Sequence, residues 1–140
     1  MTQTAITGGC LCKAVRYTIT AEPIVTRICW CRECQYWGAG SSTVNVCFPS
    51  NTVSVGGALS DYTSTAASGS PMRRRFCAKC GTQVFSGADT RPHLTFVRAG
   101  TLDDREIAKP VMTIWTASAP SWACINDDIP WVPGQPPPAA

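Results

Sequence analysis

Short stretches in which apolar and polar residues alternate recur along the chain. In "AVRYTI", Val15, Tyr17 and Ile19 fall on one face of an extended strand. Similar β-rich runs are "TVNVCF", "NTVSV", "RRRF", "TQVFS", "LTFV" and "VMTIW". Turn signals, among them glycine pairs at positions 8 and 56, separate these runs. The pattern predicts an all-β domain of several short antiparallel strands.

Helical periodicity is weak by comparison. The best candidate, Arg32 to Trp37, is long enough for one turn at most. The chain ends in "VPGQPPPAA", a composition typical of an extended polyproline-like segment. We therefore predict a single domain with little helix over residues 1–132, followed by a flexible Pro-rich tail at 133–140 whose removal costs little stability.

Size and charge narrow the functional classes. A chain of 140 residues suits one domain, near the size at which a bound metal often supplements the core. Its formal net charge of +3 gives no basis for a nucleic-acid or membrane-surface partner. The first residues lack the pattern of a signal peptide, and no run approaches the roughly 20 apolar residues of a membrane span. These features predict a cytoplasmic protein.

Cysteine is the unusual feature of the composition. The chain has nine, at positions 10, 12, 29, 31, 34, 47, 77, 80 and 124. In a reducing cytosol, cysteines at short spacing are typical of metal ligands rather than of disulfides. "CAKCG" at 77–81 is a C-x-x-C followed by glycine, in which both sulfurs can face one ion and Gly81 suits the strained backbone of the turn. This motif predicts one half of a tetrahedral zinc site.

The cysteines outside this motif can complete metal sites in two ways. Pairing neighbours in sequence gives one set at positions 10, 12, 29 and 31 and another at 34, 77 and 80. Interleaving gives a set of four at 10, 12, 77 and 80 and a set of three at 29, 31 and 34. Spacing alone does not decide between them. Interleaving is favoured because Cys34 follows Cys31 at the spacing of a zinc knuckle, so the two belong on one ion.

Several segments together resemble, in order, the sequence blocks of the glutathione-dependent formaldehyde-activating enzyme family. They are "GGCLCKAVRY" (8–17), "CWCRECQYWGA" (29–39), "FCAKCGTQVF" (76–85), "RAGTLDD" (98–104) and "TIWTASAPSW" (113–122). The resemblance extends over about residues 8 to 131. It implies a zinc-bearing, Mss4-like fold of the β-tent type, in which zinc staples antiparallel sheets.

The resemblance also implies two zinc ions with different roles. A structural zinc is implied at Cys10, Cys12, Cys77 and Cys80. A second, functional zinc is implied at Cys29, Cys31 and Cys34. The chain departs from the family pattern at Trp30, where histidine is common, and at Lys13, where glycine usually follows the first C-x-C.

Three thiolates leave zinc one ligand short of a closed tetrahedral site. An incoming thiol can take the vacant position and lose its proton there. Together with the resemblance, this predicts a carbon-sulfur lyase of the S-(hydroxymethyl)glutathione synthase type. Its substrates would be a small thiol such as glutathione and formaldehyde or another small aldehyde.

The alternative is a second site that is closed and purely structural. Its fourth ligand would be Cys47, Cys124, His93 or Asp128. The chain would then be a non-catalytic, zinc-stabilised binding module. Its two zinc ions would only hold chain segments together.

Residues near the cysteine motifs are candidates for substrate contact. Arg32 and Gln35 lie beside the three-cysteine cluster, and we assign them this role on proximity alone. In "RRRF", Arg73 and Arg75 would share one strand face and Arg74 the other. Arginines here would suit the carboxylates of a glutathione-like ligand, but a solvated face is the commoner role of a charge run.

Overall fold

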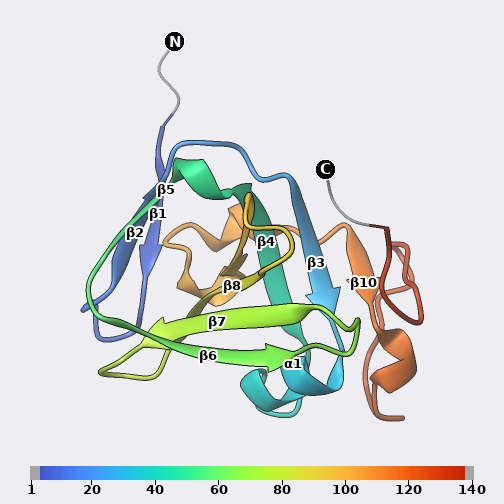
Figure 1. Cartoon of the computed structure of the whole chain (residues 1–140). Coiled ribbons are helices and arrows are strands. Elements are labelled where there is room, and N and C mark those ends of the chain that lie inside the picture. Colours follow the sequence, from blue (N-terminus) through green and yellow to red (C-terminus); the bar gives the residue numbers. More distant parts are fainter. Residues whose placement is uncertain (1–3, 138–140) are drawn as a thin grey trace.

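Two β-sheets form the framework of the computed structural model, which describes residues 4–137 (Figure 1). The smaller sheet has the order β1-β2-β5, with bounds Ile6–Gly9, Arg16–Ile19 and Val53–Gly56. The larger has the order β10-β3-β4-β9-β8-β7-β6, with bounds Met112–Ile114, Val25–Cys29, Thr43–Pro49, Leu94–Arg98, Gln83–Ala88, Pro71–Cys77 and Leu59–Thr65. The predicted all-β fold is confirmed.

Helix is confined to short segments between strands. The α-helix α1 spans Arg32–Trp37, the one turn that the sequence predicts. Four 3₁₀-helices lie elsewhere in residues 4–137: Ser50–Thr52, Ala99–Thr101, Arg105–Ala108 and Thr116–Ser118. No helix in this described range is long and apolar enough to cross a membrane.

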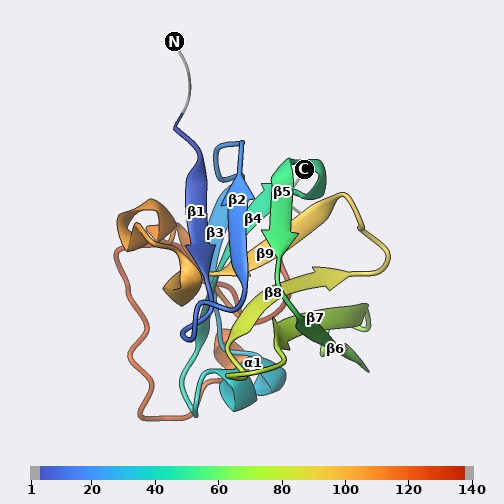
Figure 2. The same cartoon turned by 90° about the vertical axis from the view of Figure 1, so that its left-hand side faces the viewer.

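The main hydrophobic core lies between the two sheets, and Figure 2 shows the smaller sheet in front of the larger one. Tyr17 and Ile19 of β2 pack with Phe48 of β4, and all three are at most 2% exposed. Burial of such a side chain contributes roughly 1.5–3 kcal/mol. The Tyr17 hydroxyl forms a hydrogen bond with the Thr101 hydroxyl (2.8 Å). Gly8 is required beside it, because a Cβ there would lie 2.2 Å from the Tyr17 oxygen.

One pairing departs from the predicted antiparallel arrangement. β10 joins the edge of the larger sheet parallel to β3, with Thr113 opposite Ile28. The chain reaches this edge through the long connection over residues 99–111, which lets it enter in the same direction as β3. All other strand pairs are antiparallel.

The second face of the larger sheet is polar in its central strands. Val46 and Phe48 of β4 belong to the core between the sheets, so the alternate residues Asn45 and Cys47 point to the opposite face. Asn45 and Cys47 are nevertheless buried. Polar groups on a covered sheet face need hydrogen-bond or charge partners, from the protein or from a ligand.

The segment after residue 132 is part of this cover. The backbone N–H groups of Trp115 and Ala117 donate to the carbonyls of Gly134 and Pro133 (3.3 and 3.2 Å). Pro136 is buried. The sequence predicts a flexible tail whose removal costs little stability; with these contacts on residues 133–136, we instead expect its removal to cost some stability. Positions 138–140 of the predicted tail lie outside the described residues.

Candidate metal centre

Cys10, Cys12, Cys77 and Cys80 form a compact group of four sulfurs, all within 4.8 Å of one another. The first two lie in the turn between β1 and β2, and the other two lie at the end of β7 and in the turn before β8. The group therefore links the smaller sheet to the larger one. The Sγ–Sγ distances from Cys12 are 3.6 Å to Cys10 and 3.8 Å to Cys77. Sulfurs at 2.3 Å from a tetrahedral zinc would lie about 3.8 Å apart, so the geometry fits a zinc ion bound by four thiolates.

Backbone hydrogen bonds to sulfur support this group. The Sγ of Cys77 accepts from the N–H groups of Lys79 and Cys80 (both 3.3 Å), and the Sγ of Cys10 accepts from the N–H of Val15 (3.2 Å). Such bonds stabilise thiolates before and after a metal binds. The Thr82 hydroxyl forms a hydrogen bond with Cys80 (3.1 Å), which lowers the pKa of that thiol to about 5.

Cys29, Cys31 and Cys34 form the second group, and their sulfurs also lie within 4.8 Å of one another. Cys29 ends β3, Cys31 is the N-cap of α1, and Cys34 lies in that helix. The cap is made by the Cys31 sulfur, which accepts from the N–H of Cys34 (3.3 Å). The helix ends at Gly38, where a Cβ would lie 2.6 Å from the carbonyl oxygen of Ser42. The start of the helix is thus set by a cluster residue, and its end by the close approach of the chain at Gly38.

The structure supplies no fourth side-chain ligand to this second group. Within the described range, the metal-ligating atoms of the candidates Cys47, Cys124, His93 and Asp128 do not join it. Cys47 is fully buried in β4, and this burial raises the pKa of its thiol to about 11. Cys124, His93 and Asp128 are exposed. The closed second site that the sequence left open is not formed by these residues.

The charge of the three-cysteine cluster depends on contacts among its own thiols. Hydrogen bonds from Cys29 and Cys31 lower the pKa of Cys34, and the nearby Arg98 guanidinium lowers it further. The same contacts raise the pKa of Cys29, because two adjacent thiolates would repel each other. Burial lowers the pKa of Arg98 itself. Negative charge is thus favoured on one sulfur first, and a cation is needed to hold all three as thiolates.

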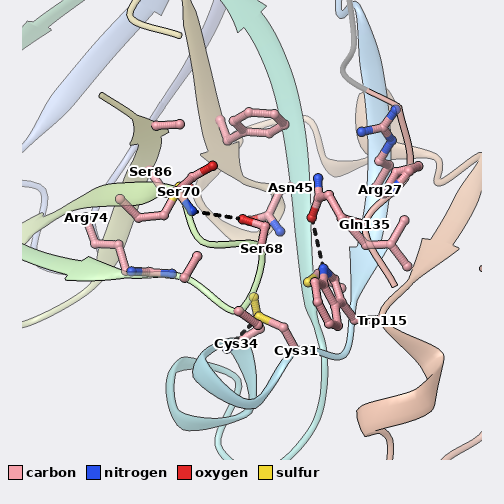
Figure 3. A pocket seen from close by; sticks show the side chains of 18 of the residues that line it. Arg27, Cys31, Cys34, Asn45, Ser68, Ser70, Arg74, Ser86, Trp115 and Gln135 are labelled. Carbon is pink, nitrogen blue, oxygen red and sulfur yellow. Dashed lines mark hydrogen bonds between the residues drawn. The ribbon is translucent and has the colours of Figure 1, made fainter. Parts of the chain in front are cut away.

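The three-cysteine cluster opens into a pocket of about 330 Å³ on the polar face of the larger sheet. Figure 3 shows Cys31 and Cys34 at the base of the pocket, with Arg74 on one side and Trp115 on the other. The segment 66–70 and residues 135–136 complete the wall. The volume is in the range of small-molecule sites. The four-cysteine group does not line this pocket.

The arginine run behaves as strand alternation predicts, but one arginine is not solvated. Arg73 and Arg75 are both within 4.0 Å of Asp61 on the outer surface. Arg74 points the other way and is 3% exposed. Its guanidinium pairs with Glu33 of α1 (2.5 Å) and lies 4.3 Å from the Trp37 ring centroid. The expected solvated face is therefore corrected for Arg74, which joins the cluster helix to β7 and lines the pocket.

The two residues predicted to contact substrate do not line the pocket. Arg32 is exposed on α1 and donates to the Gln35 side-chain oxygen (2.7 Å). Gln35 is buried, and its side-chain N–H groups donate to the carbonyls of Trp30 and Ser118 (2.8 and 2.9 Å). Gln35 thereby anchors the cluster segment to the C-terminal part of the chain.

Comparisons with known proteins show the family of the chain and support its fold. The sequence model described as "Glutathione-dependent formaldehyde-activating enzyme" matches residues 5–118, which is most of the chain. The chain belongs to this family. A crystal structure of a Rhodobacter sphaeroides protein superposes with a TM-score of 0.55 at 19% identity, over 90% of this chain and 99% of that one, and so supports the fold. No curated protein matches the sequence.

One departure from the family pattern has a local explanation. Lys13, where the family usually has glycine, adopts a left-handed backbone with φ of 68°. Its N–H donates to the Cys10 carbonyl (3.1 Å) in the turn that carries the first C-x-C. Glycine suits this conformation because it has no Cβ. The second departure, Trp30, is 4% exposed and packs edge-on against Trp122, so its ring does not line the pocket.

Sequence reasoning missed several residues that line the pocket of this family member. Arg27, Asn45, Arg98 and Trp115 were not predicted as site residues. Arg27 could have been predicted from the sequence, because it lies two positions before Cys29 and therefore on the same face of β3. Asn45 and Arg98 reach the pocket only through strand pairing with distant segments.

Proposed function

We propose that the protein binds a small thiol such as glutathione at a zinc ion held by Cys29, Cys31 and Cys34, and adds it to formaldehyde or another small aldehyde. One observation carries this proposal. The three-cysteine cluster has no fourth side-chain ligand among the described residues, and it opens into a pocket of about 330 Å³. A second zinc, at Cys10, Cys12, Cys77 and Cys80, would be structural.

The donor sets fit zinc. Thiolate sulfur is the ligand type that selects zinc in four-sulfur sites, and sulfurs of both groups lie close enough to share an ion. When bound at the open cluster, zinc would hold the sulfur of an incoming thiol as a thiolate at neutral pH. The nine cysteines form no disulfide. This supports our further proposal that the protein works in a reducing compartment such as the cytoplasm.

The chain's own residues would organise the reaction. Arg74 and Gln35 fix the cluster helix, and Trp115 with residues 135–136 covers the pocket and reduces access of water. In the addition, the thiol releases its proton to solvent and its sulfur forms a bond to the aldehyde carbon. The carbon–oxygen π bond opens, and the oxygen takes a proton from solvent to give a hemithioacetal.

Two measurements test this function on the zinc-loaded protein. X-ray absorption at the zinc edge should show an additional sulfur neighbour when glutathione is added. The rate of hemithioacetal formation should exceed the uncatalysed rate, because thiols also add to formaldehyde without a catalyst. The Cys31→Ser variant at equal zinc should fall to that background. Equal rates for the two proteins would remove the enzymatic claim, and an unchanged zinc spectrum would remove thiol binding.

A further inference from the structure

Three polar residues form a row across the centre of the pocket face. The strand registers pair Arg27 of β3 with Asn45 of β4, and Asn45 with Arg98 of β9. Directly paired residues point to the same side of a sheet. All three line the pocket, and Figure 3 shows Arg27 and Asn45 on the side away from Cys31 and Cys34.

Asn45 holds Arg98 in place within this row. The Arg98 guanidinium donates to the Asn45 side-chain oxygen (2.6 Å), and the Asn45 amide donates to the Thr43 hydroxyl (3.0 Å). Arg98 and Asn45 are 8% and 9% exposed. A guanidinium fixed in this way is already oriented for an anion, so a ligand would lose little free energy in ordering it.

The row lacks the carboxylate partners that four other arginines of the protein have. Arg16, Arg73, Arg74 and Arg75 each pair with a carboxylate. Within residues 4–137, neither Arg27 nor Arg98 has a carboxylate within 4.0 Å. The Nε atoms of both are buried without a hydrogen-bond partner. Burying a cation without an anion is costly, so the folded protein has a reason to bind one here.

The negative charge of the zinc-loaded cluster would offset only part of the positive charge of this row. Three thiolates around a divalent zinc carry a net charge of −1, and Arg98 is the row member whose charge acts on Cys34. Arg27 remains uncompensated. Arg27 and Cys29 are two positions apart on β3, which places their Cα atoms about 7 Å from each other. A ligand could therefore reach from the cluster to the row with a few covalent bonds.

No aspartate or glutamate of the described residues lines the pocket. A ligand ammonium would therefore find no carboxylate there, while it would face the arginines. Resting on the proposed function, we propose that the Arg27–Asn45–Arg98 row binds an acidic group of the thiol substrate. The site thereby selects thiols that carry a carboxylate a few bonds from the sulfur and no ammonium in that position.

Three thiols of similar size test this selection on the zinc-loaded protein by calorimetry. They are 3-mercaptopropionate, which is anionic, 2-mercaptoethanol, which is neutral, and cysteamine, which is cationic. We expect the anionic thiol to bind about tenfold or more tightly than the neutral one, with cysteamine the weakest, because a charge-assisted bidentate contact is worth at least this factor. Equal dissociation constants for the three thiols would overturn the proposal.

Substitutions test whether the preference for the anionic thiol comes from the row. Arg27→Met should remove the preference for 3-mercaptopropionate and leave 2-mercaptoethanol unchanged, while Arg27→Lys should retain part of it. Arg73→Met is the matched control on the outer surface and should leave the dissociation constants of all three thiols unchanged. Arg27 is half-buried and belongs to none of the ion pairs among residues 4–137, so these variants should fold, as circular dichroism would verify. A preference that survives in Arg27→Met would also overturn the proposal.

Succinate separates this inference from the proposed function because it has carboxylates and no sulfur. If thiols fail to bind but succinate binds and Arg27→Met weakens it about tenfold, the row stands and the thiol chemistry falls. If 2-mercaptoethanol binds to the zinc and succinate does not bind at all, with no preference for 3-mercaptopropionate, the thiol chemistry stands and the row falls. Failure of every ligand would overturn both.

Discussion

The two cysteine clusters use the same ligand chemistry in different surroundings. In the four-cysteine group, Cys12 and Cys80 are exposed, and the sulfurs lie between turns of the two sheets. In the three-cysteine group, every sulfur belongs to a residue at most 7% exposed, and the group opens into a pocket. The number of ligands in each group thus matches the space around it. The complete group connects chain segments, and the incomplete group lies where the chain leaves room for another molecule.

Losing one sulfur from the four-cysteine group should have the largest effect on the stability of the fold. Cys80→Ser removes no buried packing because the residue is exposed, so its effect reports the metal site. Structural zinc contributes about 10–16 kcal/mol in small modules, which matches or exceeds the usual stability of 5–15 kcal/mol for a whole domain. We expect the variant to be unfolded at room temperature by circular dichroism, with zinc content per chain reduced.

Cys31→Ser is the matched control in the three-cysteine group. Serine is a good N-cap, so α1 should persist, and the variant should stay folded with the four-cysteine metal site intact. A Cys80→Ser variant that melts within a few degrees of the parent protein would contradict the structural role. Unfolding of both variants alike would erase the difference between the clusters.

Breaking the buried ion pair that holds the cluster helix should have the next largest effect. Arg74→Met leaves Glu33 without its partner and also loses the hydrogen bond to Ser64 (2.8 Å). We expect a loss of about 3 kcal/mol in the free energy of unfolding, measured with urea. Arg73→Met breaks an exposed pair with Asp61 and should cost at most about 1 kcal/mol. Equal losses would show that the Arg74 pair does not fasten the cluster.

Removing the residues that cover the pocket should cost less stability than breaking this ion pair. A chain that ends after Val132 loses the backbone bonds to Pro133 and Gly134 and the bond from the Trp115 indole to Gln135 (2.9 Å). We expect destabilisation of about 1–3 kcal/mol, at roughly 1 kcal/mol per hydrogen bond less the entropy of ordering the segment. Gln135→Ala, which loses one of these bonds, should cost about 1 kcal/mol. A truncated chain as stable as the full one would contradict the packing role of residues 133–137.

A change beside the four-cysteine group should have the smallest effect, and it should be stabilising. Lys13→Gly relieves the left-handed conformation in the turn between Cys10 and Val15. The gain should be about 0.5–1 kcal/mol, since the relief of roughly 1–2 kcal/mol is partly offset by the greater freedom of glycine in the unfolded chain. Lys13→Ala removes the charge but keeps the conformation, so it should give no gain. The thermal midpoints of the two variants would separate backbone strain from charge.

The fold could be predicted from local patterns to the extent that strands alternate in polarity. The run containing Tyr17 and Ile19 indicated its strand correctly, whereas β1 was missed because Gly8 and Gly9 carry no side chain to show alternation. The four-cysteine group could be inferred because its two halves are short motifs. Its assignment needed the family resemblance, since spacing allowed two pairings.

The pocket could not be predicted because its residues look like solvent-facing positions. Arg27 precedes Ile28 and Arg98 follows Val97, and charged residues take such places beside apolar ones on any half-exposed strand. Their burial depends on coverage by residues 66–70 and 135–136, which come from distant parts of the chain. Long-range coverage of this kind leaves no trace in local periodicity. For the same reason Arg74 was expected on a solvated face.

The alternation along β4 and β9 has a consequence for how this protein can diversify. Asn45 and Arg98 serve the pocket, while their neighbours Val46 and Val97 fill the core on the opposite face. Each pair is adjacent in sequence but separated by the thickness of the sheet. Under the proposed function, mutation at positions 27, 45 and 98 would vary the substrate preference while the core contacts between the sheets are inherited unchanged. Libraries randomised at these three codons would explore new ligands on a constant scaffold.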